Sequence, residues 1–174
     1  MLVFLFTLLL AALLTPLVIA LYRKNNWLDD PSEKKHKKNT HTNRVPRGGG
    51  IVIFLSALIG ALIFLEFDSY LVALFLGAFL LTVVGTLDDI FDLHPALRIG
   101  TGLAAALIVV GSGIGIGYVT NTFGSGVIQL DQPQLSVTLF GTQRTVWIVA
   151  DIFAVIFILW NMNIVNWAKG VDGQ

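Results

Sequence analysis

The sequence predicts an all-α polytopic membrane protein, with five transmembrane helices and a small external β-hairpin in a single transmembrane domain over residues 1–174. The chain is 55% hydrophobic and only 13% charged, and its mean hydropathy is +0.79, which is not the composition of a soluble domain. Five apolar stretches approach the roughly 20 residues that a helix needs to cross a bilayer core. The chain contains no cysteine, which excludes disulfides and thiolate metal sites.

The predicted spans are residues 2–21, 48–65, 70–87, 99–119 and 146–165. No basic residue precedes the first span and several follow it, so we interpret it as a retained helix and not as a cleaved signal peptide. The fifth span contains one acid, Asp151, near its outer end. For this residue we expect access to outer water or an ion pair with Arg144, and no part in chemistry.

The loop between the first two spans fixes the orientation, because it carries eight of the eleven Lys and Arg residues of the chain. By the positive-inside rule this loop is cytoplasmic. Alternation then places residues 66–69 and 120–145 outside, and residues 88–98 and the end of the fifth span inside. Within the second outer segment, apolar and polar side chains alternate about Pro133, which predicts the external hairpin, with its turn at Pro133.

Three carboxylates, Asp88, Asp89 and Asp92, follow the uncharged third span. If the helix continues, Asp88 and Asp92 lie one turn apart on one face, with Asp89 about 100° around the axis. Acids this close repel one another unless a cation lies between them, and hard oxygen ligands of this kind suit Mg²⁺. The alternative is a solvated helix end, but the spacing directly against the bilayer favours a functional site.

A second candidate group is the basic loop that leads into the second span. His41, Arg44 and Arg47 precede three consecutive glycines at residues 48–50. Glycines allow a backbone to approach a ligand closely, and an inward-pointing helix N-terminus favours an anion. The alternative is a flexible loop whose arginines reach the lipid headgroups. The residues alone leave both interpretations open.

A third group closes the fifth span, where asparagines occur at 161, 163 and 166. Such amides are costly if they face lipid. Asn163 and Asn166 share a helix face, and a Gly-x-Asp-Gly stretch at residues 170–173 follows them. We interpret these amides as groups that hold a ligand. In the short inner loop, by contrast, Pro95 marks the start of the fourth span, and His94 is interpreted as a polar loop residue.

Together these residues resemble the polyprenyl-phosphate N-acetylhexosamine-1-phosphate transferases of the glycosyltransferase family 4 type. That family includes undecaprenyl-phosphate GlcNAc-1-phosphate transferases and phospho-MurNAc-pentapeptide transferases. Residues 46–49, Pro-Arg-Gly-Gly after His41, are similar to its basic loop. Residues 85–93 resemble its Asp-Asp signature, with Pro95 and Arg98 where the family has a proline and a basic residue. Residues 163–173 resemble its Asn-x-x-Asn-x-x-Asp-Gly-x-Asp-Gly signature.

The chain departs from the family pattern at three places. Lys169 stands where the family has the first Asp of its last signature, and Trp167 replaces a leucine. The distance from Asp30 to His41 is also longer than usual, so His36 is a rival for the loop histidine. These departures concern the choice of sugar donor more than the type of reaction.

The resemblance implies an enzyme of cell-envelope glycan biosynthesis, such as that of lipopolysaccharide or teichoic acid. It would move a sugar-1-phosphate from a UDP-sugar to polyprenyl phosphate, with release of UMP. It implies a multi-pass protein of the prokaryotic plasma membrane with a cytoplasmic active face. It further implies Mg²⁺ or Mn²⁺ as cofactor and no nucleic-acid partner, and it leaves a homodimer open.

The resemblance also implies residue roles. The acids Asp88, Asp89 and Asp92 would be catalytic, with Asp88 as the base and Asp89 also on the metal. Asn163 and Asn166 would hold the metal or the diphosphate. Substrate contacts would come from Lys38, His41, Arg47, Lys169 and Asp172, the last at the nucleotide.

Three rival classes fit the sequence less well. Isoprenoid synthases also use Asp-Asp-x-x-Asp, but they are soluble and carry two acidic motifs. A transporter would place ionisable residues near the membrane midplane, whereas here they gather at one face, and a non-catalytic scaffold would not need the three motifs. The family pattern continues past Gln174 with a further metal-binding Asp and a His-containing loop. We therefore expect this chain to be the N-terminal part of a larger helical bundle, inactive alone.

Overall fold

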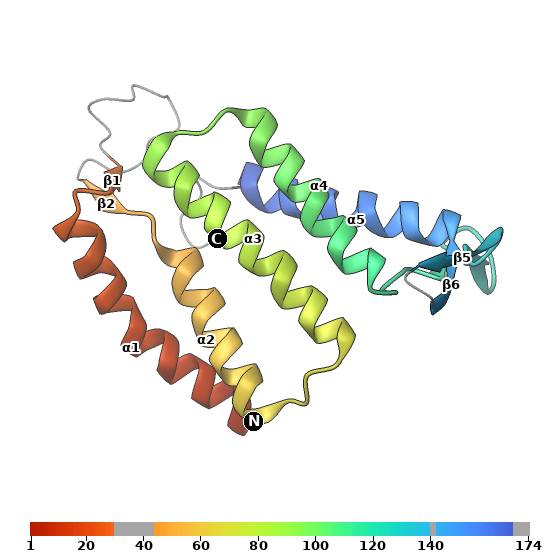
Figure 1. Ribbon diagram of the computed structural model, residues 1–174, viewed down its shortest axis with the longest axis horizontal. Helices are drawn as coiled ribbons and strands as arrows, with labels where there is room; N and C mark the ends of the chain where they lie inside the picture. The colour runs from red at the N-terminus through yellow and green to blue at the C-terminus, as the bar shows by residue number, and fades with distance from the viewer. Residues whose placement is uncertain (30–43, 140–141, 169–174) are drawn as a thin grey trace.

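The computed structural model describes residues 1–29, 44–139 and 142–168, and describes the backbone alone at 29, 137–139, 142–144 and 165–168. Within these ranges five α-helices form the body of the chain (Figure 1). They are α1 (Leu2–Lys24), α2 (Gly49–Phe64), α3 (Ser69–Phe91), α4 (Pro95–Gly111) and α5 (Ile148–Ala168). The prediction of five helices is therefore confirmed for the described residues.

Consecutive helices are packing partners: α1 with α2, α2 with α3, α3 with α4, and α4 with α5. Figure 1 shows the first four side by side, with α5 crossing α4. Small residues allow the close approach. Ala105 and Ala106 of α4 are buried, and a Cβ at Gly77 of α3 would lie 3.3 Å from the Ala105 carbonyl oxygen. Membrane helix pairs commonly use small residues in this way.

Two helices, α1 and α3, are long and apolar enough to cross a membrane. The apolar helices α2 and α4 and the part of α5 over residues 148–164 are shorter. At 1.5 Å per residue α4 is about 25 Å long, slightly less than the ~30 Å bilayer core. Leu9, Leu13 and Leu17 of α1 are exposed and follow one helix face. Length and composition thus support membrane spanning for two of the five predicted spans.

The fourth span was predicted over residues 99–119, and the helix is found over Pro95–Gly111. The helix ends early because Gly113 takes φ +107, a backbone conformation that glycine tolerates and that stops an α-helix. Residues 112–117 form neither helix nor strand, and the next element is a strand, β3 (Tyr118–Thr120). Hydropathy alone extended the prediction into them, because glycine and valine continue the apolar pattern without continuing the helix.

The turn between α3 and α4 sets the geometry of the site described below. Asp92 follows the last residue of α3 and takes a left-handed conformation, with φ 53° and ψ 63°. His94 then caps α4, its Nδ1 accepting a hydrogen bond from the Ala96 N–H at 3.2 Å. Proline is favoured in the first turn of a helix, and Pro95 begins α4. The predictions for His94 as a polar loop residue and Pro95 as a helix start are confirmed.

The prediction of a single external hairpin with its turn at Pro133 is wrong. In the described part of this segment two antiparallel hairpins occur instead, β3 with β4 (Val127–Gln129) and β5 (Gln134–Leu139) with β6 (Thr142–Trp147). Pro133 lies between them. The sequence of β6 is rich in β-branched and aromatic residues, which favour a strand. The prediction paired the residues on the two sides of Pro133 and assigned Val146 to the fifth helix, so it missed β6 as the partner of β5.

The short sheet of β1 (Leu28–Asp29) and β2 (Val45–Pro46) joins the end of α1 to the start of α2. At the opposite end of the bundle, Asp151 lies in the first turn of α5 and accepts a hydrogen bond from the Trp147 N–H at 3.1 Å. Asp151 therefore caps the start of its own helix with Oδ2, and its expected access to outer water or pairing with Arg144 stays a prediction. The side chain of Arg144 is outside the described residues.

Candidate functional site

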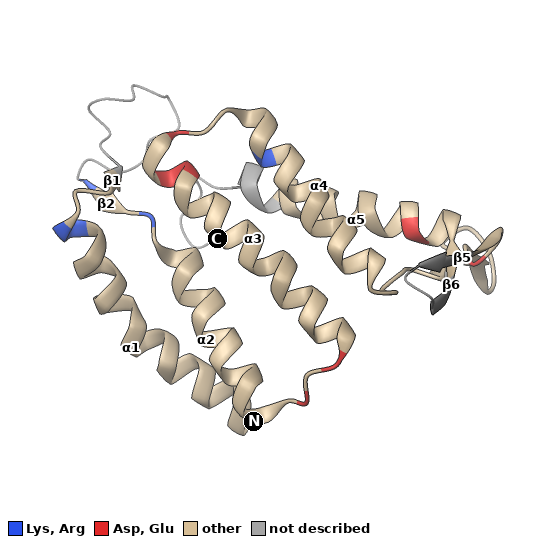
Figure 2. Cartoon of the chain, in the orientation of Figure 1, with Lys and Arg blue, Asp and Glu red and all other residues tan. Residues whose placement is uncertain are grey.

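Charged residues gather at the end of the bundle where α3 ends and α4 begins (Figure 2). Arg23 and Lys24 end α1, and Arg47 precedes α2. Asp88 and Asp89 lie in the last turn of α3, and Arg98 in the first turn of α4. These residues are distant in sequence, and the alternating direction of the helices brings them to one end. The predicted convergence at one face is confirmed for the described residues.

An ion pair links α3 to α4. Arg98 Nε lies 2.9 Å from Asp88 Oδ2, and the side chains are 39% and 15% exposed, respectively. The pair follows from the turn between the helices, since the His94 cap and Pro95 start α4 one turn before Arg98. Charge-assisted contacts of this length are stronger than neutral hydrogen bonds. The sequence identified Arg98 only as a basic residue of a motif, without its partner.

The second oxygen of Asp88 has a different environment. Oδ1 is buried and has no hydrogen-bond partner among the described residues. Leaving a buried acceptor unpaired costs about 1–3 kcal/mol, and more for a charged group. Asp88 Oδ1 is therefore available to a cation or a hydrogen-bond donor from beyond the described residues. This oxygen is the strongest structural indication that Asp88 acts in a binding or catalytic site.

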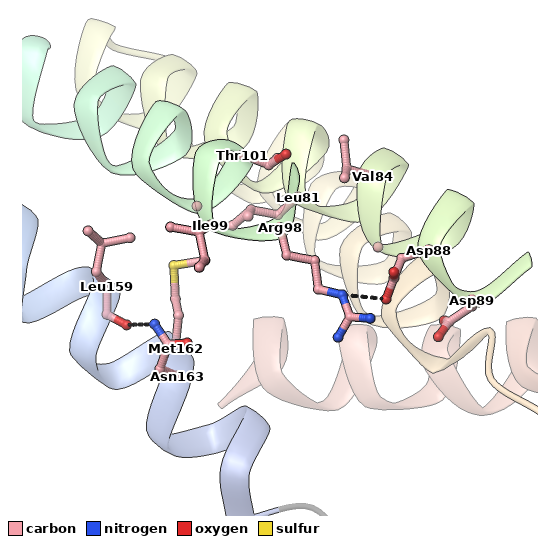
Figure 3. A pocket seen from close by; sticks show the side chains of 12 residues that line it. Leu81, Val84, Asp88, Asp89, Arg98, Ile99, Thr101, Leu159, Met162 and Asn163 are labelled. Atoms are coloured by element: carbon pink, nitrogen blue, oxygen red, sulfur yellow. Dashed lines mark hydrogen bonds and ion pairs between the residues drawn. The ribbon is translucent and has the colours of Figure 1, made fainter. Parts of the chain in front are cut away.

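A cavity of about 370 Å³ lies between α3, α4 and α5, next to this oxygen. Figure 3 shows the Asp88–Arg98 pair on one side of it and Asn163 on the other. Its polar side chains are Asp88, Asp89, Arg98, Thr101 and Asn163. Its apolar side chains are Leu81, Val84, Ile99, Leu159 and Met162. The cavity thus combines charged groups at one end with an apolar lining, as a lipid with a charged headgroup would require.

Asn163 is positioned by its own helix. Its Nδ2 donates to the Leu159 carbonyl oxygen at 2.8 Å, which leaves the amide oxygen as the acceptor atom of this side chain. Gly102 of α4 allows α5 to approach, because a Cβ there would lie 3.4 Å from Leu159 Cδ2 and 3.5 Å from Met162 Cε. The amide predicted from the sequence therefore does line a cavity with the acids.

A second cavity, of about 280 Å³, lies on the other side of α3, against α1 and α2. Its polar side chains are Tyr22, Arg47, Thr82, Thr86 and Asp89. Asp89, Gly85 and Leu81 line both cavities. Asp89 therefore stands between two compartments at one end of the bundle. Sequence reasoning did not find Tyr22 or Thr86, because each continues an apolar helix pattern.

Only some of the predicted site residues line the two cavities. The structure brings Asp88, Asp89 and Asn163 together in the first cavity, and Arg47 and Asp89 together in the second. Asp92 lines neither cavity. Asn166 lies in α5, but its side chain is outside the described residues. Four further predicted residues, and the rival His36, also lie outside them: Lys38, His41, Lys169 and Asp172.

The expected three-carboxylate cluster does not form as a ligand set. Over the described ranges, no three His, Cys, Asp or Glu side chains are placed to hold a metal ion together. The helix α3 ends at Phe91, and Asp92, in a left-handed conformation after it, does not line the cavity that Asp88 lines. Mg²⁺ usually takes only one or two protein carboxylates and completes its shell with water and substrate phosphates. Asp89 and the Asn163 amide oxygen, which line the same cavity, fit that smaller donor set.

The fold and the site together define a class of protein. It is a bundle of apolar helices in which two neighbouring carboxylates, a guanidinium and an amide line cavities at one end. The model of the family described as glycosyl transferase family 4 matches residues 71–174. The chain belongs to this family. The matched region contains α4, α5 and all but the first two residues of α3, and with them the acids, Arg98 and Asn163. The resemblance seen in the sequence motifs is confirmed.

Two curated relatives are similar over nearly the whole chain. The chain is 26% identical over 171 residues to a probable undecaprenyl-phosphate N-acetylglucosaminyl 1-phosphate transferase of Bacillus subtilis, covering 98% of the chain and 42% of the relative. It is 29% identical over 160 residues to an undecaprenyl-phosphate alpha-N-acetylglucosaminyl 1-phosphate transferase of Thermotoga maritima, covering 92% and 41%. The chain thus spans about two fifths of the length of these relatives. No solved structure matches it significantly.

Proposed function

We propose that the protein is a phosphoglycosyl transferase of the prokaryotic plasma membrane, with five spans in this chain and its active face in the cytoplasm. It moves N-acetylhexosamine-1-phosphate from a UDP-sugar to polyprenyl phosphate. Both curated relatives are named as transferases of N-acetylglucosaminyl 1-phosphate with undecaprenyl phosphate. The observation that carries the proposal is the buried, unpartnered Asp88 Oδ1 at a cavity with a charged end and an apolar lining.

The proposed reaction is a single displacement at phosphorus. An oxygen of the lipid phosphate forms a bond to the β-phosphorus of the UDP-sugar. The bond from that phosphorus to the oxygen bridging the two phosphates breaks, and this oxygen leaves with its electron pair as part of UMP. The sugar phosphate is then joined to the lipid phosphate as a diphosphate. Catalysis of such steps depends mainly on positioning and on charge stabilisation.

Asp88 has two functions in this scheme, one for each oxygen. Oδ2 is held by Arg98 at 2.9 Å, which fixes the orientation of the carboxylate. Oδ1 is the atom that receives the proton when the attacking phosphate is singly protonated, and it passes that proton to water. A general base must lie within hydrogen-bond reach of the proton that it accepts. The lining of the cavity by both Asp88 and Arg98 allows a phosphate to reach either group.

Asp89 and Asn163, with Asn166, are the residues that would hold Mg²⁺ or Mn²⁺. When bound, the cation would offset the negative charge that develops on the phosphate of the departing UMP. Arg47 lies on the other side of Asp89 and supplies a second positive charge. The roles of Lys38 and His41 at a phosphate, of Asp172 at the nucleotide, and of Lys169 in donor choice stay predictions, as does that of Asp92.

The test is an assay of membranes from cells that express the gene, with UDP-N-acetylhexosamine, polyprenyl phosphate and Mg²⁺. We expect UMP release that requires the lipid, together with a polyprenyl-diphosphate sugar in equal amount. Membranes carrying Asp88→Asn at matched expression are the control for other transferases. The proposal is wrong if wild-type membranes and Asp88→Asn membranes release UMP at the same rate.

A further inference from the structure

Tyr22, in the last turn of α1, is the largest fully buried side chain among the described residues, with 1% of its surface exposed. Its ring is fixed on two sides. It packs edge-on against Trp27, with ring centroids 5.6 Å apart. On the other side, a Cβ at Gly48 would lie only 2.7 Å from Tyr22 Cε2. The glycine before α2 therefore makes room for this ring, and the ring cannot turn away from the cavity that it lines.

The hydroxyl of Tyr22 is buried without a hydrogen-bond partner in the described chain. The Thr86 side chain interacts with this hydroxyl, and the charge of Asp89 acts on it, but the contact with Thr86 falls short of hydrogen-bond geometry. Buried tyrosine hydroxyls normally find a partner, and an unpaired one costs about 1–3 kcal/mol. A phenylalanine would fill the same space without this penalty. The hydroxyl is therefore unexplained by packing.

The hydroxyl lies in the cavity of about 280 Å³ between α1, α2 and α3. That volume is far larger than the roughly 10–15 Å³ that one water needs. The threonines of this cavity cannot serve as additional donors, since Thr82 donates to the Ala78 carbonyl and Thr86 to the Thr82 carbonyl. Among the described side-chain hydroxyls that line this cavity, Tyr22 is thus the one whose proton is not already donated in a hydrogen bond.

Two further features of the cavity favour an anion. Arg47 is part of the lining, and so are Gly48 and Gly50 at the N-terminus of α2. A helix N-terminus presents backbone N–H groups and positive partial charge. Asp89 opposes these groups and would repel a phosphate by itself. A divalent cation on Asp89, as in the proposed function, removes that repulsion.

We propose that this cavity binds a phosphate group of a substrate, and that the Tyr22 hydroxyl donates a hydrogen bond to one of its oxygens. The inference rests on the proposed function and adds to it a binding residue outside the three motifs. The phosphate is either that of the polyprenyl lipid or that of the nucleotide. Both are phosphate esters next to Asp89, and direct binding measurements distinguish them.

The experiment measures binding to the purified full-length protein in detergent with Mg²⁺, by ligand-dependent thermal stabilisation. UMP and undecaprenyl phosphate are titrated separately. Tyr22→Phe removes only the hydroxyl and keeps the ring packed on Trp27 and Gly48. Loss of a hydrogen bond to a charged group predicts about 10- to 100-fold weaker binding of one of the two ligands. The affected ligand identifies the substrate whose phosphate occupies the cavity.

Tyr70→Phe is the matched control, because it deletes the same hydroxyl at the opposite end of α3, where Tyr70 is 49% exposed. It should leave both affinities unchanged. Gly50→Ala tests the cavity without touching Tyr22: it adds a methyl group to the lining, and its Cβ meets no atom within 4 Å. The control for Gly50→Ala is Gly100→Ala. A Cβ at Gly100 also meets no atom within 4 Å, but Gly100 lines neither cavity at this end of the bundle. Gly50→Ala should weaken the same ligand as Tyr22→Phe.

The inference and the proposed function fail in different ways. If Tyr22→Phe and Gly50→Ala bind both ligands as tightly as wild type, or if wild type binds neither ligand at millimolar concentration, the phosphate cavity is wrong. Transferase activity could then still be normal in membranes. If binding weakens as expected while no lipid-dependent UMP release is found, the phosphate cavity holds and the proposed reaction is wrong.

Discussion

Arg98 Nε lies 2.9 Å from Asp88 Oδ2, so that one ion pair ties the last turn of α3 to the first turn of α4. The left-handed Asp92 and the His94 cap hold the short turn between these helices. The pair occupies one carboxylate oxygen and leaves Oδ1 buried without a partner among the described residues. Arg98 therefore orients Asp88 and also presents a cation to the cavity. Both effects would depend on the same 2.9 Å contact.

Asp88→Asn should lower lipid-dependent UMP release about 100-fold or more, the usual contribution of a general base. The amide keeps the shape of the side chain but lacks the negative charge and the proton acceptor. Asp68→Asn is the matched control, since Asp68 caps the opposite end of the same helix through a 2.7 Å bond from the Leu71 N–H, and asparagine caps equally well. Equal turnover of the two variants would exclude Asp88 from the chemistry.

Arg98→Gln should lower kcat/KM by about 10- to 100-fold, because an ionised partner at a carboxylate contributes about 1.5–3 kcal/mol. If Arg98 acts through Asp88, the double variant Asp88→Asn/Arg98→Gln should be no slower than Asp88→Asn alone. The measurement is a double-mutant cycle on initial rates of UMP release. Strictly multiplicative losses would show that Arg98 acts on the substrate independently of Asp88.

Gly48→Ala should destabilise the packing of α1 on α2. An added Cβ would lie 2.6 Å from Val18 Cγ1 and 2.7 Å from Tyr22 Cε2, and overpacking of a fixed ring costs about 1–3 kcal/mol. Gly100→Ala, whose Cβ has open space, should be neutral or slightly stabilising because alanine is the better helix former. Thermal unfolding in detergent compares the two, and equal midpoints would contradict the packing described for Gly48.

The helices and much of the site could be predicted because their signals are local. Apolar runs without charge predict the helices, and Pro95 and Asp88–Asp89 mark where α4 begins and α3 ends. Alternation of membrane helices then brings Arg47, the acids and Asn163 to one end. The strand partner of β5 could not be predicted in this way, because β6 ends in Val146 and Trp147, which run without a break into the apolar sequence of α5.

Tyr22 shows a different limit of the sequence. An aromatic residue before Arg23 and Lys24 is typical of a membrane interface, and nothing local distinguishes it from a lipid-facing side chain. Its burial depends on α2, since Val52 and the missing side chain of Gly48 form its pocket. The pairing of Arg98 with Asp88 likewise could not be predicted, because it depends on the conformation of Asp92 and the cap at His94. Such contacts follow from tertiary packing, and no periodic pattern in the sequence indicates them.

Asp89→Asn should raise the Mg²⁺ concentration needed for half-maximal UMP release, because the carboxylate would be one of the few protein ligands of the cation. Chelation should abolish release from wild-type membranes, and either Mg²⁺ or Mn²⁺ should restore it. Arg98→Gln is an informative comparison, because Arg98 lines the same cavity. This variant should lower the turnover rate more than it changes the Mg²⁺ concentration needed for half-maximal release. An unchanged Mg²⁺ titration for Asp89→Asn would remove Asp89 from the metal site.

The membrane orientation is tested by labelling single cysteines, for which the cysteine-free chain needs no prior substitution. The predicted orientation places the end of α1 in the cytoplasm and the loops before α3 and after β3 outside. Glu66→Cys and Phe123→Cys, both at exposed positions, should react with a membrane-impermeant maleimide on intact cells. Asn25→Cys, exposed at the end of α1, should react only after permeabilisation. Since UDP-sugars are cytosolic, labelling of Asn25→Cys on intact cells would place the acids on the wrong side for this donor and contradict the proposed reaction.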